Sequence, residues 1–482
     1  MSIARRVAFG TAQLTLSNVF VRVLSLVTMP VLTRLLAPSA YGTAAMATTL
    51  ISLISVFALA GADISYIRAY HSEKPPCGQA VEALTWRFSL GASMLAAILL
   101  AACWSLISDA LLLPRYTGPL IAAGIVLSVG MTMALARARL HDRHRAMSLA
   151  TVASGLGATG IAIAVAYSGQ RNEFPLILAL LATYLIPVIV LGLPPLPELL
   201  HSSGLGYESR KHILGIGLAA IVSAPAYWVM SSSDRWFLSH FQNLTAVGVY
   251  SISCGVAIAG MTVNSALLAI WTPEAARLFE ARPPDAMHQL GRITEGMVAV
   301  LACVWLAVTA AGGDMVRLLT APAFHGGANV IPFIAGGVFF HGISHLANTA
   351  FVLDKRLNRT IIWWVGGAAA NLMLNLLLVP EIGMMGAGVS QLLSFAVTAL
   401  GLSMGARRML AAHIKWTRLL LVVTTIVIAA LFMFPAWAKL PAISLIMKLP
   451  VGLFVTAIVI SYFRNDFAAL GGGKKVVSLH KA

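Results

Sequence analysis

Charged residues are scarce in this sequence. Asp, Glu, Lys and Arg make up 10% of the 482 residues, whereas about 25% is usual in soluble domains. Hydrophobic residues account for 59%, and the mean hydropathy of +0.86 is spread along the whole chain. This composition excludes a soluble domain of any size and indicates an all-α polytopic membrane protein.

Cysteine is also rare. The four cysteines, Cys77, Cys103, Cys254 and Cys303, lie far apart, and three of them fall in expected membrane spans. This spacing fits neither a disulfide framework nor a zinc knuckle.

The usual patterns of catalytic groups are missing. No two acidic residues stand at i and i+2, as a metal-dependent sugar-nucleotide transferase would commonly show. The segment "GGGKK" (471–475) lacks the G-x-x-x-x-G-K-[ST] spacing of a phosphate-binding loop, and no outer connection is long enough for a catalytic domain. We therefore predict that the protein is not an enzyme and holds no cofactor, with a proton or sodium ion as the candidate coupling ion for transport.

Long apolar runs are abundant. A window of about 19 residues, with about 20 apolar residues needed to cross the hydrocarbon, predicts fourteen transmembrane helices. Their centres lie near residues 20, 54, 94, 127, 157, 183, 226, 258, 302, 340, 369, 393, 425 and 452.

The basic residues are distributed unevenly around these spans. Both termini and the connections on one side hold 25 of the 33 Lys and Arg residues, the other side holds 6, and Arg22 and Lys448 lie inside spans. This asymmetry is typical of an even number of spans with both termini in the cytoplasm. It also explains the net charge of +16 by topology and contact with anionic lipid, without nucleic-acid binding.

Two sequence patterns recur at similar offsets. "TRLLAPSAYG" (33–42) follows the first span and "DRWFLSHFQNLTAVG" (234–248) follows the seventh, each with an arginine, a turn and a glycine in that order. "LHDRHR" (140–145) is echoed by "LDKRLNR" (353–359). The recurrence predicts two six-span halves related by an axis along the membrane normal. The expected domains are an N-terminal six-helix bundle (1–196), a cytoplasmic linker (197–212), a C-terminal six-helix bundle (213–412), and two further helices with a basic tail (413–482).

Arg22 lies in the middle of the first span, in the run "SNVFVRVLSL" (17–26). At about 1.5 Å per residue it is some 20 Å from either end, and an arginine facing lipid at that depth costs at least about 2.5–3.5 kcal/mol. Thr15, Asn18 and Ser25 share its helical face at steps of three and four. We predict that this face lines a hydrated path. The alternative is neutralisation of Arg22 by an acid in a packed interior, but no acidic residue is expected at comparable depth.

Other polar residues in the spans are candidates for the same path: Tyr227, Ser231, Asn264, His341, His345, Asn348, Asn371 and Asn375. Each could instead form an interhelical hydrogen bond, worth under about 1 kcal/mol on average in membranes. His341 and His345, at i and i+4, also resemble half of a metal site. Because a zinc site needs a third protein ligand and the neighbouring sequence offers none, we predict no metal.

Four stretches carry a family pattern: "LTRLLAPSAYG" (32–42), "GADISYIR" (61–68), "DRWFL" with "VGVYS" (234–251) and "NLMLNLLLVPEIGMMGAG" (371–388). In combination they resemble the polysaccharide-transporter branch of the multidrug/oligosaccharidyl-lipid/polysaccharide (MOP) exporter superfamily, which includes the O-antigen flippases. The positions that fit the pattern are Arg34, Pro38, Tyr41, Gly42, Asp63, Arg68, Asp234, Arg235, Gly248, Pro380, Gly383 and Gly386.

The resemblance implies two six-helix bundles in a V-shaped, MATE-like arrangement, with two extra C-terminal helices, in the bacterial inner membrane. It implies a flippase that moves an undecaprenyl-pyrophosphate-linked oligosaccharide, an O-antigen or exopolysaccharide repeat unit, from the cytoplasmic to the periplasmic leaflet by alternating access. Expected partners are membrane lipids and, in the same pathway, a glycan polymerase and a chain-length regulator. The protein itself is expected to be a monomer.

The residues suit such a substrate. A pyrophosphate that carries hydrophilic sugars needs a hydrated path with a fixed positive charge, which Arg22 supplies. Two other classes stay open. A cation-coupled small-molecule exporter of the same superfamily would show an acidic residue deep in a bundle, and a membrane-embedded glycan polymerase or ligase would need an outer catalytic loop.

Overall fold

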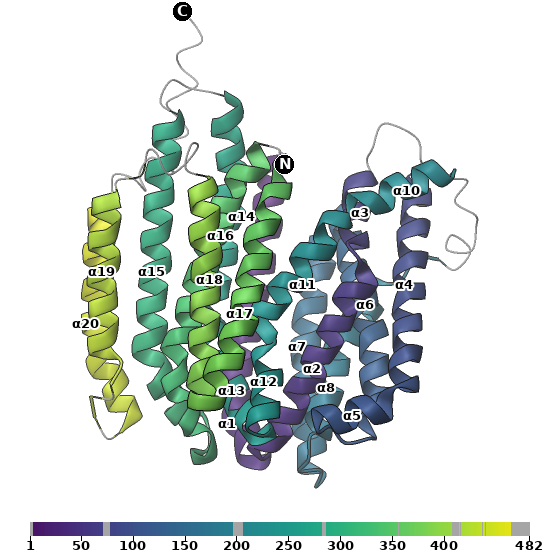
Figure 1. Cartoon of the computed structure of the whole chain (residues 1–482), viewed down its shortest axis with the longest axis horizontal. Helices are drawn as coiled ribbons and strands as arrows, with labels where there is room; N and C mark the ends of the chain where they lie inside the picture. The colour runs from purple at the N-terminus through teal and green to yellow at the C-terminus, as the bar shows by residue number, and fades with distance from the viewer. Residues whose placement is uncertain are drawn as a thin grey trace, which may run out of the picture. The chain divides into compact units, whose positions relative to one another are not determined.

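The computed structural model describes residues 3–70, 78–195, 206–281, 286–354, 356–406, 414, 416–435, 437–438 and 440–463. Throughout this part of the chain the regular secondary structure is helical (Figure 1). The all-α architecture expected from the apolar composition is therefore confirmed.

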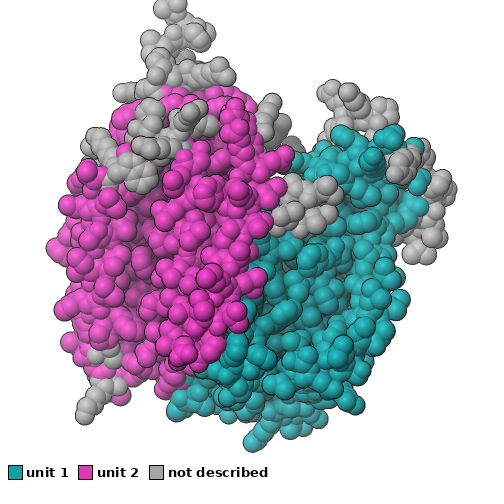
Figure 2. All heavy atoms as spheres, in the orientation of Figure 1, with its two compact units in different colours: residues 1–251, 319–324 teal, residues 252–318, 325–482 magenta. Residues whose placement is uncertain are grey.

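The chain forms two compact units (Figure 2), one of residues 1–251 with 319–324 and one of residues 252–318 with 325–482. The first unit contains α1 (Ile3–Leu35), α2 (Pro38–Leu59), α3 (Ala62–Ala69), α4 (Gly78–Ala102), α5 (Trp104–Leu111), α6 (Thr117–Leu140), α7 (His144–Tyr167), α8 (Phe174–Leu191), α10 (Tyr207–Ile216), α11 (Leu218–Ser232), α12 (Asp234–Phe241) and the start of α13 (Leu244–Ala257). The second contains η1 (Ile258–Gly260), α14 (Met261–Ala281), α15 (Ala286–Leu319), most of η2 (Pro322–Val330), α16 (Ile331–Leu353), η3 (Leu357–Thr360), α17 (Ile361–Ile382), α18 (Met384–Gly405), α19 (Trp416–Met433) and α20 (Pro441–Tyr462).

Twelve helical segments in the described part of the chain are long and apolar enough to cross a membrane. They coincide with twelve of the predicted spans, so the chain is a multi-pass membrane protein. The other two predicted spans are helical but shorter. The seventh is interrupted at Ser233 between α11 and α12, and the apolar part of α19 covers only Leu419–Met433. The count of fourteen stays a prediction.

The helices of the first unit do not all come from the first predicted half. α10, which begins inside the predicted linker, packs on α3, and α11, which follows the linker, packs on α2. Residues 197–205 of that linker lie outside the described residues, and Tyr207–Ile216 already forms α10. The division of the sequence into two six-span halves is a statement about repeats, and it stays a prediction.

Several family-pattern residues form turns between helices. Pro38 occupies the first position of α2, where the N–H that proline lacks would have no helical partner. α2 ends at a turn in which Gly61 has φ of 74°, a left-handed conformation that favours glycine. Gly383, with φ of 58°, separates α17 from α18. A β-carbon on Gly386 would overlap the backbone of Leu378, so glycine lets these two helices meet closely.

The first turns of α2 and α13 touch through Gly42 and Gly248, the fifth residue of each helix. A β-carbon built on Gly42 would overlap the carbonyl oxygen of Leu244, the first residue of α13. One built on Gly248 would overlap the carbonyl oxygen of Pro38, the first residue of α2. This reciprocal contact is the kind that a local two-fold relation between repeat copies produces. Close approach of two backbones therefore accounts for both glycines.

Candidate functional site

Arg22 lies within Gln13–Leu35, the apolar span of α1. Its guanidinium forms no hydrogen bond or ion pair with any described residue, and its side chain is neither buried nor fully exposed. α1 packs against α7, and only 6% of its apolar window is buried. Within the described residues, then, a positive charge stands at mid-span without the neutralising carboxylate that the alternative interpretation required.

The polar residues on the same face of α1 remain accessible. Asn18 and Ser25 are exposed and Thr15 is partly exposed. The Ser25 hydroxyl donates to the carbonyl oxygen of Arg22 at 2.7 Å, whereas the Asn18 amide makes no hydrogen bond in the described structure. The face therefore offers a cation and a free amide to a ligand.

The candidates on α11 and α14 form hydrogen bonds within the protein. The Ser231 hydroxyl donates to the carbonyl oxygen of Tyr227 at 2.9 Å. Asn264 is buried, and its amide donates to the carbonyl oxygen of Val338 at 2.9 Å, which ties α14 to α16. The Asn264 contact is of the kind that helix packing in membranes uses, whereas the Ser231 contact lies within α11. A role for these residues in a substrate path stays a prediction.

The second unit brings the remaining candidates together in two pairs. Asn375 donates to the side-chain oxygen of Asn371 at 3.0 Å, and both are buried on α17. On α16 the Nε2 atoms of His341 and His345 are 3.1 Å apart, and Asn348 follows on the same face. No group of three His, Cys, Asp or Glu able to hold a metal occurs among the described residues.

Asp234 and Arg235, two family-pattern positions, form a network where α12 begins. Asp234 is buried, accepts a hydrogen bond from the Tyr250 hydroxyl, and pairs with the Arg235 guanidinium at 3.3 Å. Arg235 also donates to the hydroxyl of Ser251 at 3.3 Å. The network ties α12 to α13 and is internally satisfied, so it stabilises the break after Ser233.

The other family-pattern side chains have the following contacts and positions. Arg34 donates to the carbonyl oxygen of Pro30 at 2.9 Å within α1, and the Tyr41 ring packs edge-on against Phe324 with centroids 5.3 Å apart. Asp63 and Arg68 stand in the first and last turns of α3, and Pro380 lies inside α17 near its end. An acid at the start and a base at the end of a helix both complement its dipole.

Buried acids are the residues that the sequence did not indicate. Glu295 and Asp314 on α15 are each 1% exposed. Asp314 accepts hydrogen bonds from Lys448 Nζ at 2.6 Å and from the Ser444 hydroxyl at 2.8 Å, and Lys448 also donates to the carbonyl oxygen of Ala310 at 3.0 Å. The sequence does contain one indication of a buried acid: Lys448 lies inside an apolar run, and a lysine there needs a buried partner.

This ion pair joins α20 to α15, and we expect Lys448→Met to lower the stability of the protein by about 3–5 kcal/mol. Removing one partner of a buried pair leaves the other charge uncompensated. Thermal unfolding of the purified protein in detergent measures the loss. The double variant Lys448→Met with Asp314→Asn removes both charges and should recover part of it. Equal loss in the single and double variants would contradict the interpretation.

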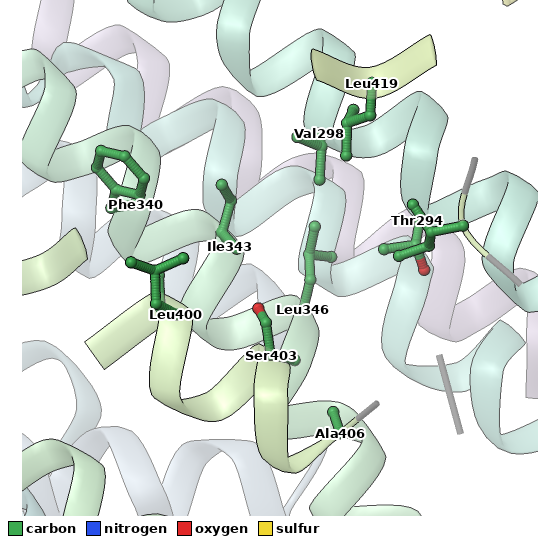
Figure 3. Close-up of a pocket in the computed structure, with 12 residues that line it drawn as sticks. Thr294, Val298, Phe340, Ile343, Leu346, Leu400, Ser403, Ala406 and Leu419 are labelled. Atoms are coloured by element: carbon green, nitrogen blue, oxygen red, sulfur yellow. The ribbon is translucent and has the colours of Figure 1, made fainter. Parts of the chain in front are cut away.

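A cavity of about 140 Å³ lies in the second unit among α15, α16, α18 and α19 (Figure 3). Its lining is apolar apart from Thr294 and Ser403, and includes Phe340, Leu400 and Leu419. It contains none of the residues predicted for the substrate path.

Comparison with solved structures identifies the fold. A structure described as the lipid II flippase MurJ in an inward closed conformation aligns with a TM-score of 0.73 at 11% identity, covering 94% of this chain and 99% of that one. An inward-facing multidrug resistance MATE family transporter of the MOP superfamily aligns with a TM-score of 0.59 at 12% identity, covering 84% and 96%. A point mutant of the Vibrio cholerae MATE transporter VcmN gives 0.56 at 11% identity, covering 84% of this chain and 96% of that one.

Comparison with curated protein sequences finds no match. A family model described as "Polysaccharide biosynthesis protein" matches residues 31–315, more than half of the chain. The family resemblance seen in the sequence motifs is thereby confirmed. The chain belongs to the polysaccharide biosynthesis protein family and has the fold of the MOP exporters.

Proposed function

We propose that the chain is a flippase that moves an undecaprenyl-pyrophosphate-linked oligosaccharide from the cytoplasmic to the periplasmic leaflet of the bacterial inner membrane, by alternating access. The family match supports a role in polysaccharide biosynthesis, and the fold is that of transporters. Both termini would lie in the cytoplasm, as the distribution of Lys and Arg predicts.

The observation that carries the proposal is Arg22 at mid-span, whose guanidinium pairs with no described residue. A pyrophosphate cannot cross hydrocarbon as a free anion, because an unpaired charge there is very costly. A guanidinium offers a planar fork of donors that matches phosphate oxygens and stays charged at any physiological pH. The amide of Asn18, one turn away, could bind a sugar hydroxyl.

The chemistry expected of an enzyme is not needed for this task. Movement between leaflets leaves every bond of the substrate intact, so the protein has only to bind, shield and release it. The family and fold are those of transporters, and we propose that the chain does no catalysis of its own.

A liposome assay tests the proposed function. The purified protein is reconstituted with a lipid-linked oligosaccharide that carries a fluorescent label, and the label exposed on each leaflet is followed with a membrane-impermeant quencher. We expect exchange between leaflets well above that of protein-free liposomes. The absence of exchange in vesicles whose protein is folded and inserted would contradict the proposal.

The burial of Glu295 favours one second candidate function, that of a cation-coupled exporter of small molecules. Glu295 is buried on α15 (Ala286–Leu319), in the first third of that helix. Two results in the same liposomes would together establish this alternative. The wild type would take up a small organic cation and Glu295→Gln would not, and neither would move lipid-linked oligosaccharide.

A further inference from the structure

The two histidines of α16 are held in direct contact. The His341 and His345 rings have centroids 4.5 Å apart and are inclined at 71°, and their Nε2 atoms are separated by 3.1 Å. At this distance one Nε2 carries a proton and donates it to the lone pair of the other, because two lone pairs facing each other would repel. His341 is 7% exposed, so water does not replace this hydrogen bond.

Aromatic rings enclose the pair. Trp364 of α17 lies with its ring centroid 6.5 Å from that of His341 and 6.0 Å from that of His345. Phe395 of α18 packs edge-on against His341 at 5.3 Å. A cation is attracted to the face of an aromatic ring within about 6 Å of its centroid, and among these separations that of Trp364 from His345 reaches this range. Trp364 is therefore the ring placed to stabilise an imidazolium on His345.

A spare acceptor lies one turn further along α16. The Asn348 Oδ1 atom is buried and has no hydrogen-bond partner in the described structure. An orphaned buried acceptor is costly and calls for a donor. Protonation of an imidazole supplies one, since both ring nitrogens then carry hydrogen.

We propose that His341 and His345 form the site that binds the coupling ion, and that this ion is a proton. In the neutral pair the donor ring keeps a free lone pair on Nδ1. An incoming proton binds there, that ring becomes an imidazolium, and its Nε2–H still donates to the neighbouring ring. The pair gains one positive charge and loses no hydrogen bond. As a coupling site it rests on the proposed function, whereas proton binding itself does not.

The described elements packed around this part of α16 contribute the following neighbouring groups. α14 contributes the neutral Asn264, bonded to Val338, and α17 and α18 contribute Trp364 and Phe395. η3 contributes Arg359, which is exposed. On α15, whose Leu301 lies at the level of Gly342, the titratable groups nearest that level are Cys303 and the buried Glu295.

Proton binding can be measured without any substrate. In protein labelled with ¹⁵N-histidine and purified in detergent, the four ring nitrogens of the pair report each tautomer. We expect the signals of both rings to move together with one midpoint, corresponding to uptake of one proton. In His341→Gln the remaining ring should titrate alone. Two independent titrations in the wild type, or no titration, would overturn the proposal.

Coupling is measured in the liposome assay under an imposed pH gradient. One pH unit is worth a factor of about ten in the distribution of a substrate exchanged against one proton. We therefore expect up to a tenfold shift of labelled lipid toward the more acidic side in the wild type. Whatever their rate of exchange, His341→Gln and His345→Gln should lose that shift, and the exposed His240→Gln should keep it.

The outcomes separate the two proposals. Wild-type protein that exchanges lipid but ignores the gradient overturns proton coupling and leaves the flippase intact. Protein that titrates as a pair but moves no lipid-linked oligosaccharide contradicts the flippase and leaves the proton site intact. If Zn²⁺ at trace concentration binds stoichiometrically and abolishes the titration, the pair is a metal site and the proposal of proton binding is overturned. If His341→Gln does not fold, His345→Asn provides the same test.

Discussion

Replacing Arg22 with alanine is expected to slow the movement of lipid-linked oligosaccharide by about one to two orders of magnitude. A hydrogen bond to a charged group contributes about 1.5–3 kcal/mol. Because the Arg22 guanidinium forms no hydrogen bond with a described residue, we expect this contribution to go to the bound substrate. The variant should unfold at about the same temperature as the wild type, because the Arg22 guanidinium has no hydrogen bond or ion pair with a described residue to lose and a costly mid-span charge is removed. Initial exchange rates in liposomes and thermal unfolding in detergent measure the two effects.

Two further variants control this experiment. Arg22→Lys keeps the charge but not the planar fork, so it should retain intermediate activity. Arg171→Ala removes an exposed arginine between α7 and α8 and should leave the rate unchanged. A normal rate in Arg22→Ala would remove Arg22 from the mechanism, and a large drop in its unfolding temperature would show that its role is structural.

Replacing Gly42 with alanine is expected to be among the most destabilising of all small substitutions in this chain. The added methyl group would overlap a backbone carbonyl oxygen of α13, and a backbone cannot move aside as a side chain can. Overpacking of this kind costs typically about 1–3 kcal/mol, and we expect the upper end or beyond. Yield of monodisperse protein and the unfolding temperature in detergent measure the loss.

The reciprocal contact permits a sharper experiment. Gly248→Ala should cost as much as Gly42→Ala, and the double variant should cost less than the sum, because helices already forced apart tolerate the second methyl group. Gly160→Ala on α7 is the matched control, since a β-carbon there would meet nothing within 4 Å. It should be neutral or stabilising by up to about 1 kcal/mol. Additive losses at Gly42 and Gly248 would contradict the reciprocal contact.

Much of the fold follows from local sequence. Apolar runs, Pro38 and Gly383 mark helices and their ends because the cost of a polar group in lipid and the φ preferences of proline and glycine act residue by residue. The interrupted seventh span was harder to foresee. Ser233 keeps helical φ and ψ of −67° and −26°, and Asp234 next to it contacts Tyr250, sixteen residues later, which no local pattern records.

Part of the candidate site can likewise be predicted from the sequence, and part of it cannot. Arg22 and its face, and the spacing of His341 and His345, are visible in sequence because residues three or four apart on a helix share a side of it. Apolar composition alone indicates a membrane protein, and the mid-span arginine alone predicts a polar partner, since both depend on free energies of transfer that each residue carries wherever it lies. The partner of Lys448, the contact of Gly42 with Gly248 and the aromatic enclosure of the histidines were decided only by packing, because which helix faces meet depends on the whole chain at once.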